Sequence, residues 1–176
     1  WQEHCEDICL ELGVDLICKT VNIKNRGTGI EDAAREARYG IFEKLLKKND
    51  LLILAHHADD QIETMLFRLF RGSGIKGMSG MPISRLLGNG ELFRPLLPFF
   101  RRDLESYALA NQINWIEDDS NLDVAFDRNF IRHKLIPTIN ERWPNSSFQL
   151  NRSANIFAES DFLINILAQK DFAIVT

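Results

Sequence analysis

The stretch LLILAHHADDQIETMLFRLF, residues 51–70, decides the fold of this chain. Leu51 to Ala55 is a short uninterrupted apolar run, as expected of a strand buried on both faces of a parallel sheet. A helical period follows the strand, with apolar residues at spacings of three and four: Ile62, Met65, Leu66, Leu69 and Phe70. A buried strand that leads directly into an amphipathic helix is typical of an α/β protein.

The opposite face of this predicted helix carries the candidate chemistry. At about 100° per residue, one side gathers Asp60, Glu63, Thr64, Phe67 and Arg71. Ligands of open α/β sheets bind at the carboxyl ends of strands, so two carboxylates that point the same way there can bind Mg²⁺ or an ammonium group. A simpler interpretation also stands, in which Asp59 and Asp60 cap the helix and Glu63 is solvated.

Two histidines leave the strand just before these acids. If neighbouring residues alternate sides, one of His56 and His57 is a core histidine and the other faces a ligand. Taken alone, HHxDD would also suit a metal-dependent phosphohydrolase. That class needs further histidine ligands, and the chain offers only His4 and His133, so it is short of ligands.

Outward from this stretch, strands and helices alternate. We expect a strand at 14–23, a helix at 30–45, a Gly- and Ser-rich surface loop at 72–90 and a short strand at 92–96. Helices are expected at 101–113, from Asn129 with an interruption at Pro137 and an end at Trp143-Pro144, and at 148–170. The predicted fold class is α/β, a Rossmann-like parallel sheet flanked by helices, with the start of a helical second domain.

Composition and charge bound the function. The 176 residues are 45% hydrophobic and 26% charged, and no apolar run approaches the roughly 18 residues of a membrane span. Cys5, Cys9 and Cys18 form no CxxC pair, which favours a reducing, cytoplasmic setting. A net charge of −4 argues against a general nucleic-acid binder, yet residues 68–102 hold seven basic residues against Glu91 alone, a segment that can meet phosphates.

Three blocks of the sequence resemble one family. AHHADDQIETMLFRLFRGSGIKGMSGM (55–81), FRPLL (93–97) and WIEDDSNLDVAFDRNFIRHKLIP (115–137) look like the tRNA(Ile)-lysidine synthetase family of the PP-loop ATP pyrophosphatase group, in the family's order. A weaker stretch, GIEDAAREARY (29–39), extends the similarity to about residues 1–145. The resemblance implies a partial PP-loop-type catalytic domain at 1–144 and a helical segment at 145–176 that opens a second domain.

The resemblance also implies a reaction. ATP adenylates C2 of the wobble cytidine in an isoleucine tRNA with a CAU anticodon, and free L-lysine displaces AMP to give lysidine. ATP and Mg²⁺ are the implied cofactors. No membrane partner is expected, and a homodimer stays open.

Roles for individual residues follow from the same resemblance. Asp60 and Glu63 would hold the lysine amine or the metal, with Asp60 as the Mg²⁺ ligand, and His57 would lie beside the nucleotide. Substrate contacts are assigned to Arg35, Arg38, Arg128 and Arg132, with Asp118, Ser120 and Asn121 as turn and cap residues. Contacts to tRNA are assigned to a flexible loop with Arg71 and Lys76, and to Arg94, Arg101 and Arg102.

One departure from the family bears on activity. The family's SGGxDS phosphate loop does not occur in this sequence, and glycine-rich backbone amides are what cradle a pyrophosphate. We therefore expect a truncated chain that binds ATP poorly and is inactive alone. Two alternatives remain, a PP-loop tRNA thiolation enzyme, disfavoured by the lack of CxxC, and a non-catalytic RNA-binding remnant.

Overall fold

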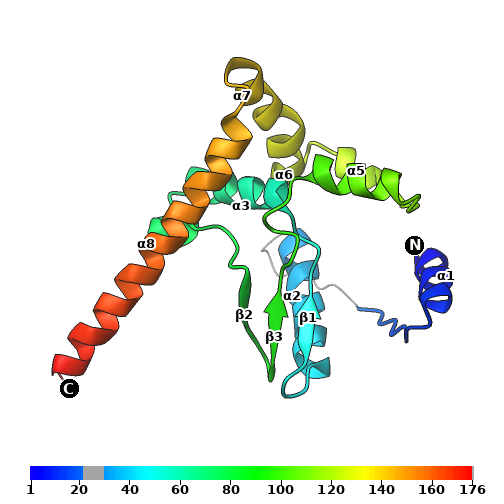
Figure 1. Cartoon of the computed structure of the whole chain (residues 1–176), viewed down its shortest axis with the longest axis horizontal. Coiled ribbons are helices and arrows are strands. Elements are labelled where there is room, and N and C mark those ends of the chain that lie inside the picture. Colours follow the sequence, from blue (N-terminus) through cyan, green and yellow to red (C-terminus); the bar gives the residue numbers. More distant parts are fainter. Residues whose placement is uncertain (22–29, 176) are drawn as a thin grey trace. The chain divides into compact units, whose positions relative to one another are not determined.

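The computed structural model describes residues 1–21 and 30–175 and divides into two compact units. Unit 1 comprises Trp1–Leu52 and Leu86–Glu91, and unit 2 comprises Ile53–Arg85 and the chain from Leu92 onward. Figure 1 labels the helices and strands along the chain. Each unit is described by itself below.

Unit 1 carries α1 (Gln2–Leu12) and α2 (Ile30–Leu45). Helix α1 ends at Gly13, whose φ of 65° is the left-handed conformation that glycine adopts at little cost. The helix predicted at 30–45 is confirmed. The strand predicted at 14–23 is not found over 14–21, where Leu16 and Ile17 are exposed without a neighbouring strand, and its last two residues lie outside the described residues.

The sheet consists of β1 (Leu51–Ile53), β2 (Ser84–Leu87) and β3 (Gly90–Phe93) in the order β1-β3-β2. Strands β1 and β3 are parallel, since Glu91 N–H donates to the Asp50 carbonyl at 3.0 Å and Leu54 N–H to the Phe93 carbonyl at 2.9 Å. Strands β2 and β3 form a hairpin and are therefore antiparallel. The α/β class is confirmed, but the sheet is mixed and not purely parallel.

Strand β1 is less buried than its apolar sequence predicts. Leu51 is 52% exposed and Ile53 is 61% exposed. Within the described sheet β1 is an edge strand, and a run of apolar residues becomes buried on both faces only when neighbouring elements cover it. The predicted strand is correct in place and wrong in burial.

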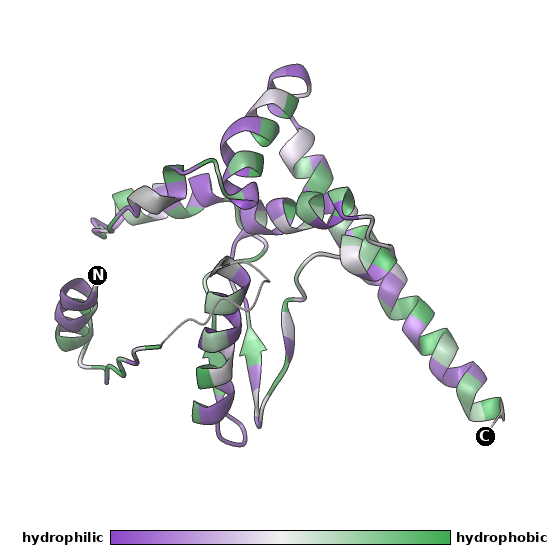
Figure 2. Cartoon of the chain, turned by 180° about the vertical axis from the view of Figure 1, so that it is seen from behind, coloured by the Kyte–Doolittle hydropathy of each residue, from purple (hydrophilic) through white to green (hydrophobic). Residues whose placement is uncertain are grey.

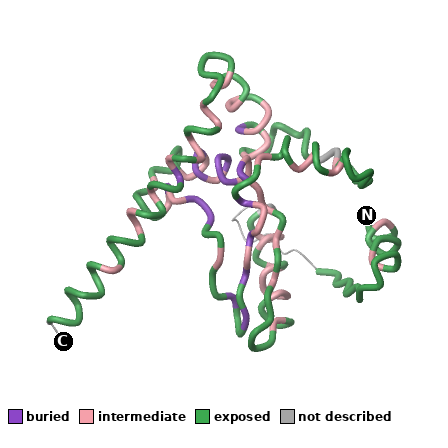
Figure 3. Tube along the Cα trace, in the orientation of Figure 1, coloured by how far each residue is buried: buried purple, intermediate pink, exposed green. Residues whose placement is uncertain are grey.

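Unit 2 is organised around α3 (Ala58–Phe70), which follows β1 directly. The buried side chains of Ile62 and Leu66 pack against Ile131, and Met65 packs with Met78 and Ala154. Figure 3 shows this concentration of buried backbone on α3. The predicted apolar stripe holds for these turns but not at the helix end, where Leu69 is 46% and Phe70 is 65% exposed.

The segment 72–90, predicted to be a surface loop, is folded. It contains α4 (Ile75–Met78) and β2, and Met78, Gly80 and Met81 are buried. The side-chain amide of Gln61 on α3 holds this segment, because it accepts from Met81 N–H at 2.6 Å and donates to the Met81 carbonyl at 3.0 Å. Arg68 donates to the carbonyls of Gly77 and Gly80 at 3.1 and 2.7 Å. Two polar side chains of α3, Gln61 and Arg68, thus hold a segment for which the sequence predicted no helix or strand.

The remaining helices follow in order. They are α5 (Arg101–Ala110), the 3₁₀ turn η1 (Asp119–Leu122), α6 (Asp127–Phe130), the π-helical turn η2 (Ile131–Leu135), α7 (Ile136–Arg142) and α8 (Ser146–Val175). The interruption predicted at Pro137 is the wide turn η2, in which Ile136 N–H donates to the Ile131 carbonyl five residues back. Proline has no N–H to donate, which favours such an irregular turn without breaking the helix.

Helix α8 runs for 30 residues and begins close to the predicted boundary at residue 145, which stays a prediction. Its first half packs on α3 and α4 through Leu150, Ala154 and Phe157. Its second half alternates hydrophobic and hydrophilic residues, with Leu163 and Leu167 exposed (Figure 2). Among the described helices, none has both the length and the apolar character that crossing a membrane requires.

Candidate functional site

The start of α3 is built by the His-Ala-Asp-Asp sequence. His57 is the N-cap in extended conformation, and its backbone N–H donates to Asp60 Oδ2 at 3.0 Å. Asp59 Oδ2 accepts from the backbone N–H of Arg101 at 2.8 Å, at the first residue of α5. The capping interpretation is therefore correct for Asp60, and Asp59 satisfies an amide of a different helix.

A guanidinium joins the two acids that the sequence singled out. Arg132 on η2 donates from Nε to Glu63 Oε1 at 2.6 Å and from Nη2 to Glu63 Oε2 at 3.1 Å, a bidentate pair. Its Nη2 also lies 3.3 Å from Asp60 Oδ1. Glu63 is 1% exposed, whereas the side chains of Asp60 and Arg132 are 16% and 26% exposed. Asp60 and Glu63 thus converge on Arg132 and do not point into bulk solvent.

The other arginine of the RNFIR segment, Arg128 on α6, contacts the residue that follows Glu63 on α3. Arg128 Nη2 donates to Thr64 Oγ1 at 3.1 Å. Asn129 Nδ2 donates to the Asp123 carbonyl, and His133 Nε2 lies 2.7 Å from the Asn121 carbonyl. Residues 118–122 form the predicted turn, with Asn121 N–H donating to the Asp118 carbonyl at 2.9 Å.

Burial and charge act together on the titratable groups of this site. Burial raises the pKa of Glu63, and the Asp60 charge adds to the rise, while the ion pair with Arg132 opposes it. Burial lowers the pKa of Arg132, but Glu63, Asp60 and Asp59 outweigh this and raise it. The net shift of the Glu63 pKa is upward, so the charges of Arg132 and Arg128 offset the effect of burial only in part.

His57 lies between Asp59 and Asp60. Its Nδ1 is 3.5 Å from Asp59 Oδ2 and its Nε2 is 3.5 Å from Asp60 Oδ2, which are ion-pair distances longer than ordinary hydrogen bonds. Burial lowers the pKa of His57, but contact with Asp59 and the negative charges of Asp60, Asp59 and Glu63 raise it above its ordinary value of 6.5. Burial raises the pKa of Asp59, and His57 together with the Arg101 N–H outweighs this and lowers it.

The Asp60 carboxylate already has two partners, and its role as a Mg²⁺ ligand stays a prediction. Both Asp60 oxygens already accept, one from His57 N–H and the other from Arg132. Within the described part of the chain, no group of three or more His, Cys, Asp and Glu residues is arranged to hold a metal ion. The exposed edges of the site instead present one carboxylate and one guanidinium side by side, which suits a ligand that carries an ammonium and a carboxylate.

The predicted tRNA-contacting residues fall in different environments. Arg71 and Lys76 are exposed at the end of α3 and on α4, and Arg101 and Arg102 are exposed in the first turn of α5. Arg101 Nε pairs with Glu105 Oε1 at 2.7 Å. Arg94 is the exception, because it is 2% exposed and its Nη1 donates to the Pro82 carbonyl at 2.7 Å. Arg94 is therefore a buried structural residue, which corrects its assignment to an RNA surface.

Arg35 and Arg38 belong to unit 1. Both lie on α2, where the Arg35 guanidinium covers the ring of Tyr39 at 5.0 Å and Arg38 is exposed. Their contacts with the substrate stay a prediction.

Sequence reasoning missed three contributions to this region. Gln61 holds the segment around Met81, Thr64 contacts Arg128, and Phe67 lies under Arg71. Gln61 had a visible signal, since it is a polar residue beside the apolar stripe of a helix. The other two depend on partners that the sequence pattern does not reveal.

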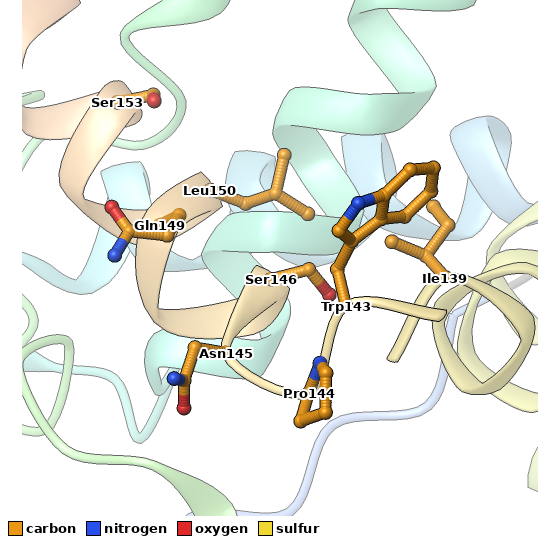
Figure 4. A pocket seen from close by; sticks show the side chains of 8 residues that line it. All are labelled: Ile139, Trp143, Pro144, Asn145, Ser146, Gln149, Leu150 and Ser153. Atoms are coloured by element: carbon orange, nitrogen blue, oxygen red, sulfur yellow. The ribbon is translucent and has the colours of Figure 1, made fainter. Parts of the chain in front are cut away.

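A cavity of about 520 Å³ lies away from these residues, where α7 turns into α8. It is open and largely apolar, and Ile139, Trp143 and Leu150 are among its lining residues (Figure 4). It shares no residue with the acid–arginine site. Since its lining carries no charged side chain, the chemistry described above belongs to α3 and η2.

Fold and site together define a class of protein. The chain is an α/β protein with a charged site at the point where a parallel strand leads into a helix, the usual ligand position in such sheets. A PP-loop domain family matches residues 1–139. The chain belongs to this PP-loop family, which implies use of ATP.

Curated relatives agree with this membership. The chain is 44% identical over 176 residues to a tRNA(Ile)-lysidine synthase of Coxiella burnetii (strain RSA 493 / Nine Mile phase I), covering 99% of this chain and 39% of that protein. It is 46% identical over 171 residues to a tRNA(Ile)-lysidine synthase of Pseudomonas fluorescens (strain Pf0-1), covering 97% and 38%. The chain therefore spans about two fifths of the length of the curated relatives it matches.

Proposed function

We propose that this chain is part of an enzyme that joins free L-lysine to C2 of the wobble cytidine in an isoleucine tRNA with a CAU anticodon. In this reaction ATP adenylates the cytidine with release of pyrophosphate, and the lysine amine then displaces AMP. The observation that carries the proposal is the Asp60–Arg132–Glu63 group, in a chain 43–46% identical to tRNA(Ile)-lysidine synthases.

The charges suggest how lysine is held. Asp60 and Arg132 are the partly exposed members of the group, so Asp60 binds an ammonium of lysine and Arg132 binds the carboxylate. Glu63 is 1% exposed and acts through Arg132 by fixing the orientation of its guanidinium. Arg128, held by Thr64, faces the same substrate. The family resemblance assigns substrate contacts to Arg35 and Arg38 as well.

ATP and the tRNA complete the proposed site. His57 lies beside the nucleotide, and Mg²⁺ enters with the ATP phosphates, because magnesium ions are usually bound through one or two carboxylates plus phosphates. The exposed basic residues Arg71, Lys76, Arg101 and Arg102 meet the tRNA backbone. The predicted setting is the cytoplasm.

The test is lysine incorporation by the full-length gene product. Labelled lysine, ATP and the isoleucine tRNA are supplied, and incorporation is measured together with AMP release. Asp60→Asn keeps an acceptor for His57 N–H, so the helix cap survives. It lowers kcat/KM for lysine at least about tenfold, because a hydrogen bond to a charged group contributes about 1.5–3 kcal/mol.

Arg142→Lys, an exposed change on α7, is the matched control and leaves incorporation unchanged. In a parallel reaction that also contains sulfide as the sulfur donor, incorporation of sulfur without lysine identifies a thiolation enzyme. Binding of tRNA without AMP release identifies an RNA-binding protein. Either result overturns the proposal.

A further inference from the structure

Three guanidinium groups lie along one face of α3. Arg132 contacts Glu63, Arg128 contacts Thr64, and Arg71 covers the ring of Phe67 with its Cζ 4.6 Å from the ring centroid. Residues 63, 64, 67 and 71 follow the helical spacing that keeps side chains on one side. The acid–arginine site and the Arg71–Phe67 pair therefore share a face of α3.

Arg71 differs from the other exposed arginines of unit 2 that the sequence singled out. Arg101 pairs with Glu105, and Arg102 lies 3.6 Å from Asp103. In the described part of the chain, no hydrogen bond or ion pair involves the Arg71 side chain, and its recorded partner is the face of an aromatic ring. Phe67 is half-buried and packs against the Ile62–Leu66–Ile131 core, so the ring is a fixed support.

We propose that Arg71, supported by Phe67, is a stacking platform for an unpaired nucleobase of the RNA substrate. A guanidinium is planar and weakly hydrated, and one face that covers an aromatic ring leaves the other available to a base. Unpaired RNA bases are commonly recognised by stacking on aromatic rings or arginine planes. The inference rests on the proposed function in taking RNA as the substrate.

The distance along α3 suits this role. Glu63 and Arg71 are separated by about 12 Å at about 1.5 Å per residue. This is the span of a few nucleotides at about 3.4 Å each. A nucleotide that lies next to the lysine bound at the acid–arginine site can thus have a neighbour of the same RNA loop stacked on Arg71.

Arg71→Lys separates stacking from phosphate binding, because lysine keeps the charge and loses the plane. Binding of a fluorescein-labelled RNA hairpin with a CAU loop to the full-length gene product is measured by anisotropy at several salt concentrations. We expect affinity to fall about tenfold, which is about 1.4 kcal/mol and within the range of one base stack. The slope of affinity against salt stays unchanged, since no charge is lost.

Hairpins with one base removed at each loop position identify the partner. Removal of the base that stacks on Arg71 weakens wild-type binding about tenfold. The same removal does not weaken RNA binding by Arg71→Lys any further. Arg142→Lys is the control on α7 and responds to base removal as the wild type does. The proposal is overturned if Arg71→Lys binds RNA with wild-type affinity. It is also overturned if each base removal weakens the binding of Arg71→Lys as much as it weakens the binding of the wild type.

Lysine incorporation measured over a range of tRNA concentrations separates this inference from the proposed function. Arg71→Lys raises the KM for tRNA about tenfold, in proportion to its loss of RNA affinity, because the platform contributes to RNA binding. Only the platform is overturned if neither Arg71→Lys nor any base removal changes RNA affinity while the wild type incorporates lysine. Stacking effects without any lysine incorporation by the wild type overturn the proposed function and leave the platform standing.

Discussion

Arg132 connects a buried acid to the surface of unit 2. The carboxylate of Glu63 is taken out of water, and both of its oxygens accept from Arg132. A charge buried in this way is stable only while its partner is present. The pair therefore contributes to stability as well as to ligand binding.

Arg132→Ala should destabilise the chain by about 3 kcal/mol, the lower end of the range for a buried ion pair that loses one partner. The lower end applies because the Arg132 side chain is 26% exposed. Glu63 would then take up a proton, since burial already raises its pKa. Urea unfolding monitored by circular dichroism measures the change.

Arg142→Ala on α7 removes an exposed arginine and is the control, with an expected change within about 0.5 kcal/mol. The double variant Glu63→Leu/Arg132→Met should recover most of the loss, because it leaves no unpaired charge. Equal stability of Arg132→Ala and wild type would show that the pair adds nothing.

His57 should make stability depend on pH. Its pKa is raised in the folded chain above the ordinary value of 6.5, so its contribution is complete below that value. The contribution is lost as the pH rises through the folded-state pKa. Titration of the His57 ring by NMR should show this raised pKa. Asp59→Asn should lower the pKa of His57, because it removes the negative charge of a carboxylate whose Oδ2 lies 3.5 Å from His57 Nδ1.

The free energy of unfolding should accordingly fall between neutral and mildly alkaline pH, and His57→Asn should flatten this fall. His4→Asn changes a histidine of α1 in unit 1 and serves as the control. A His57 ring that titrates below 6.5 would contradict the arrangement of charges around it.

At the scale of elements, α3 shows how far pattern reasoning reaches. The core positions Ile62, Met65 and Leu66 follow from helical spacing and are buried as predicted. The convergence of Asp60 and Glu63 also follows from spacing. Their partner Arg132 lies 69 residues from Glu63, and no periodicity in the sequence specifies that contact. The site could be located from the sequence, but its closure by arginine could not.

In the 72–90 segment the sequence predicts less structure than the chain has. Its glycines predict a loop, yet Gln61 fixes it by a pair of hydrogen bonds to the Met81 backbone. Together with Arg68, which donates to the carbonyls of Gly77 and Gly80, Gln61 supplies the order that local propensity does not predict. Such compensation is visible only in three dimensions, because it depends on which carbonyls and amides come within reach.

Two glycines of this region provide a matched test. Gly72 and Gly80 have φ of 75° and 66°, so alanine costs about 1 kcal/mol at either position. A Cβ at Gly80 would lie 2.5 Å from Gln61 Oε1, whereas one at Gly72 meets nothing within 4 Å. Gly80→Ala should cost a further 1–3 kcal/mol, roughly the penalty of overpacking. Urea unfolding of both variants gives the difference, and equal losses would argue against the Gln61 contact.

The hairpin element makes a prediction about Arg94. Its side chain is buried and bonds the Pro82 carbonyl, so Arg94→Ala should lower stability by about 1–3 kcal/mol, the cost of an unsatisfied buried group. RNA affinity of the folded variant should keep the wild-type salt dependence. Arg142→Ala on α7, an exposed position, is the control for stability. A reduced salt slope for folded Arg94→Ala would restore Arg94 to the RNA surface.

At the scale of the whole molecule, the α/β class and most helices follow from sequence. The strand expected at 14–23, as far as its described residues 14–21 go, and the burial of β1 do not, for a common reason. Both expectations assume neighbours on each side of a strand, and in the described chain Leu51 and Ile53 remain exposed. An apolar segment is buried only where a neighbouring element covers it, and composition does not show whether that element is present.

Activity should depend on more than these 176 residues. The sequence contains no SGGxDS phosphate loop, so the chain alone should release no pyrophosphate from ATP in the presence of tRNA and lysine. Calorimetric titration with ATP should show weak or no binding. The full-length gene product in the same assay is the comparison, and turnover by the 176-residue chain would contradict this expectation.

The phase of the RNFIR segment has a consequence for anyone who transplants this site. Phe130 and Ile131 have regular helical dihedral angles (φ −60° and −59°, ψ −45° and −47°), so Arg128 and Arg132 project about 40° apart at about 100° per residue. They reach Thr64 and Glu63, which are consecutive residues of α3. A graft of the motif onto another helical scaffold therefore needs a facing helix that offers an acid and a hydroxyl at neighbouring positions.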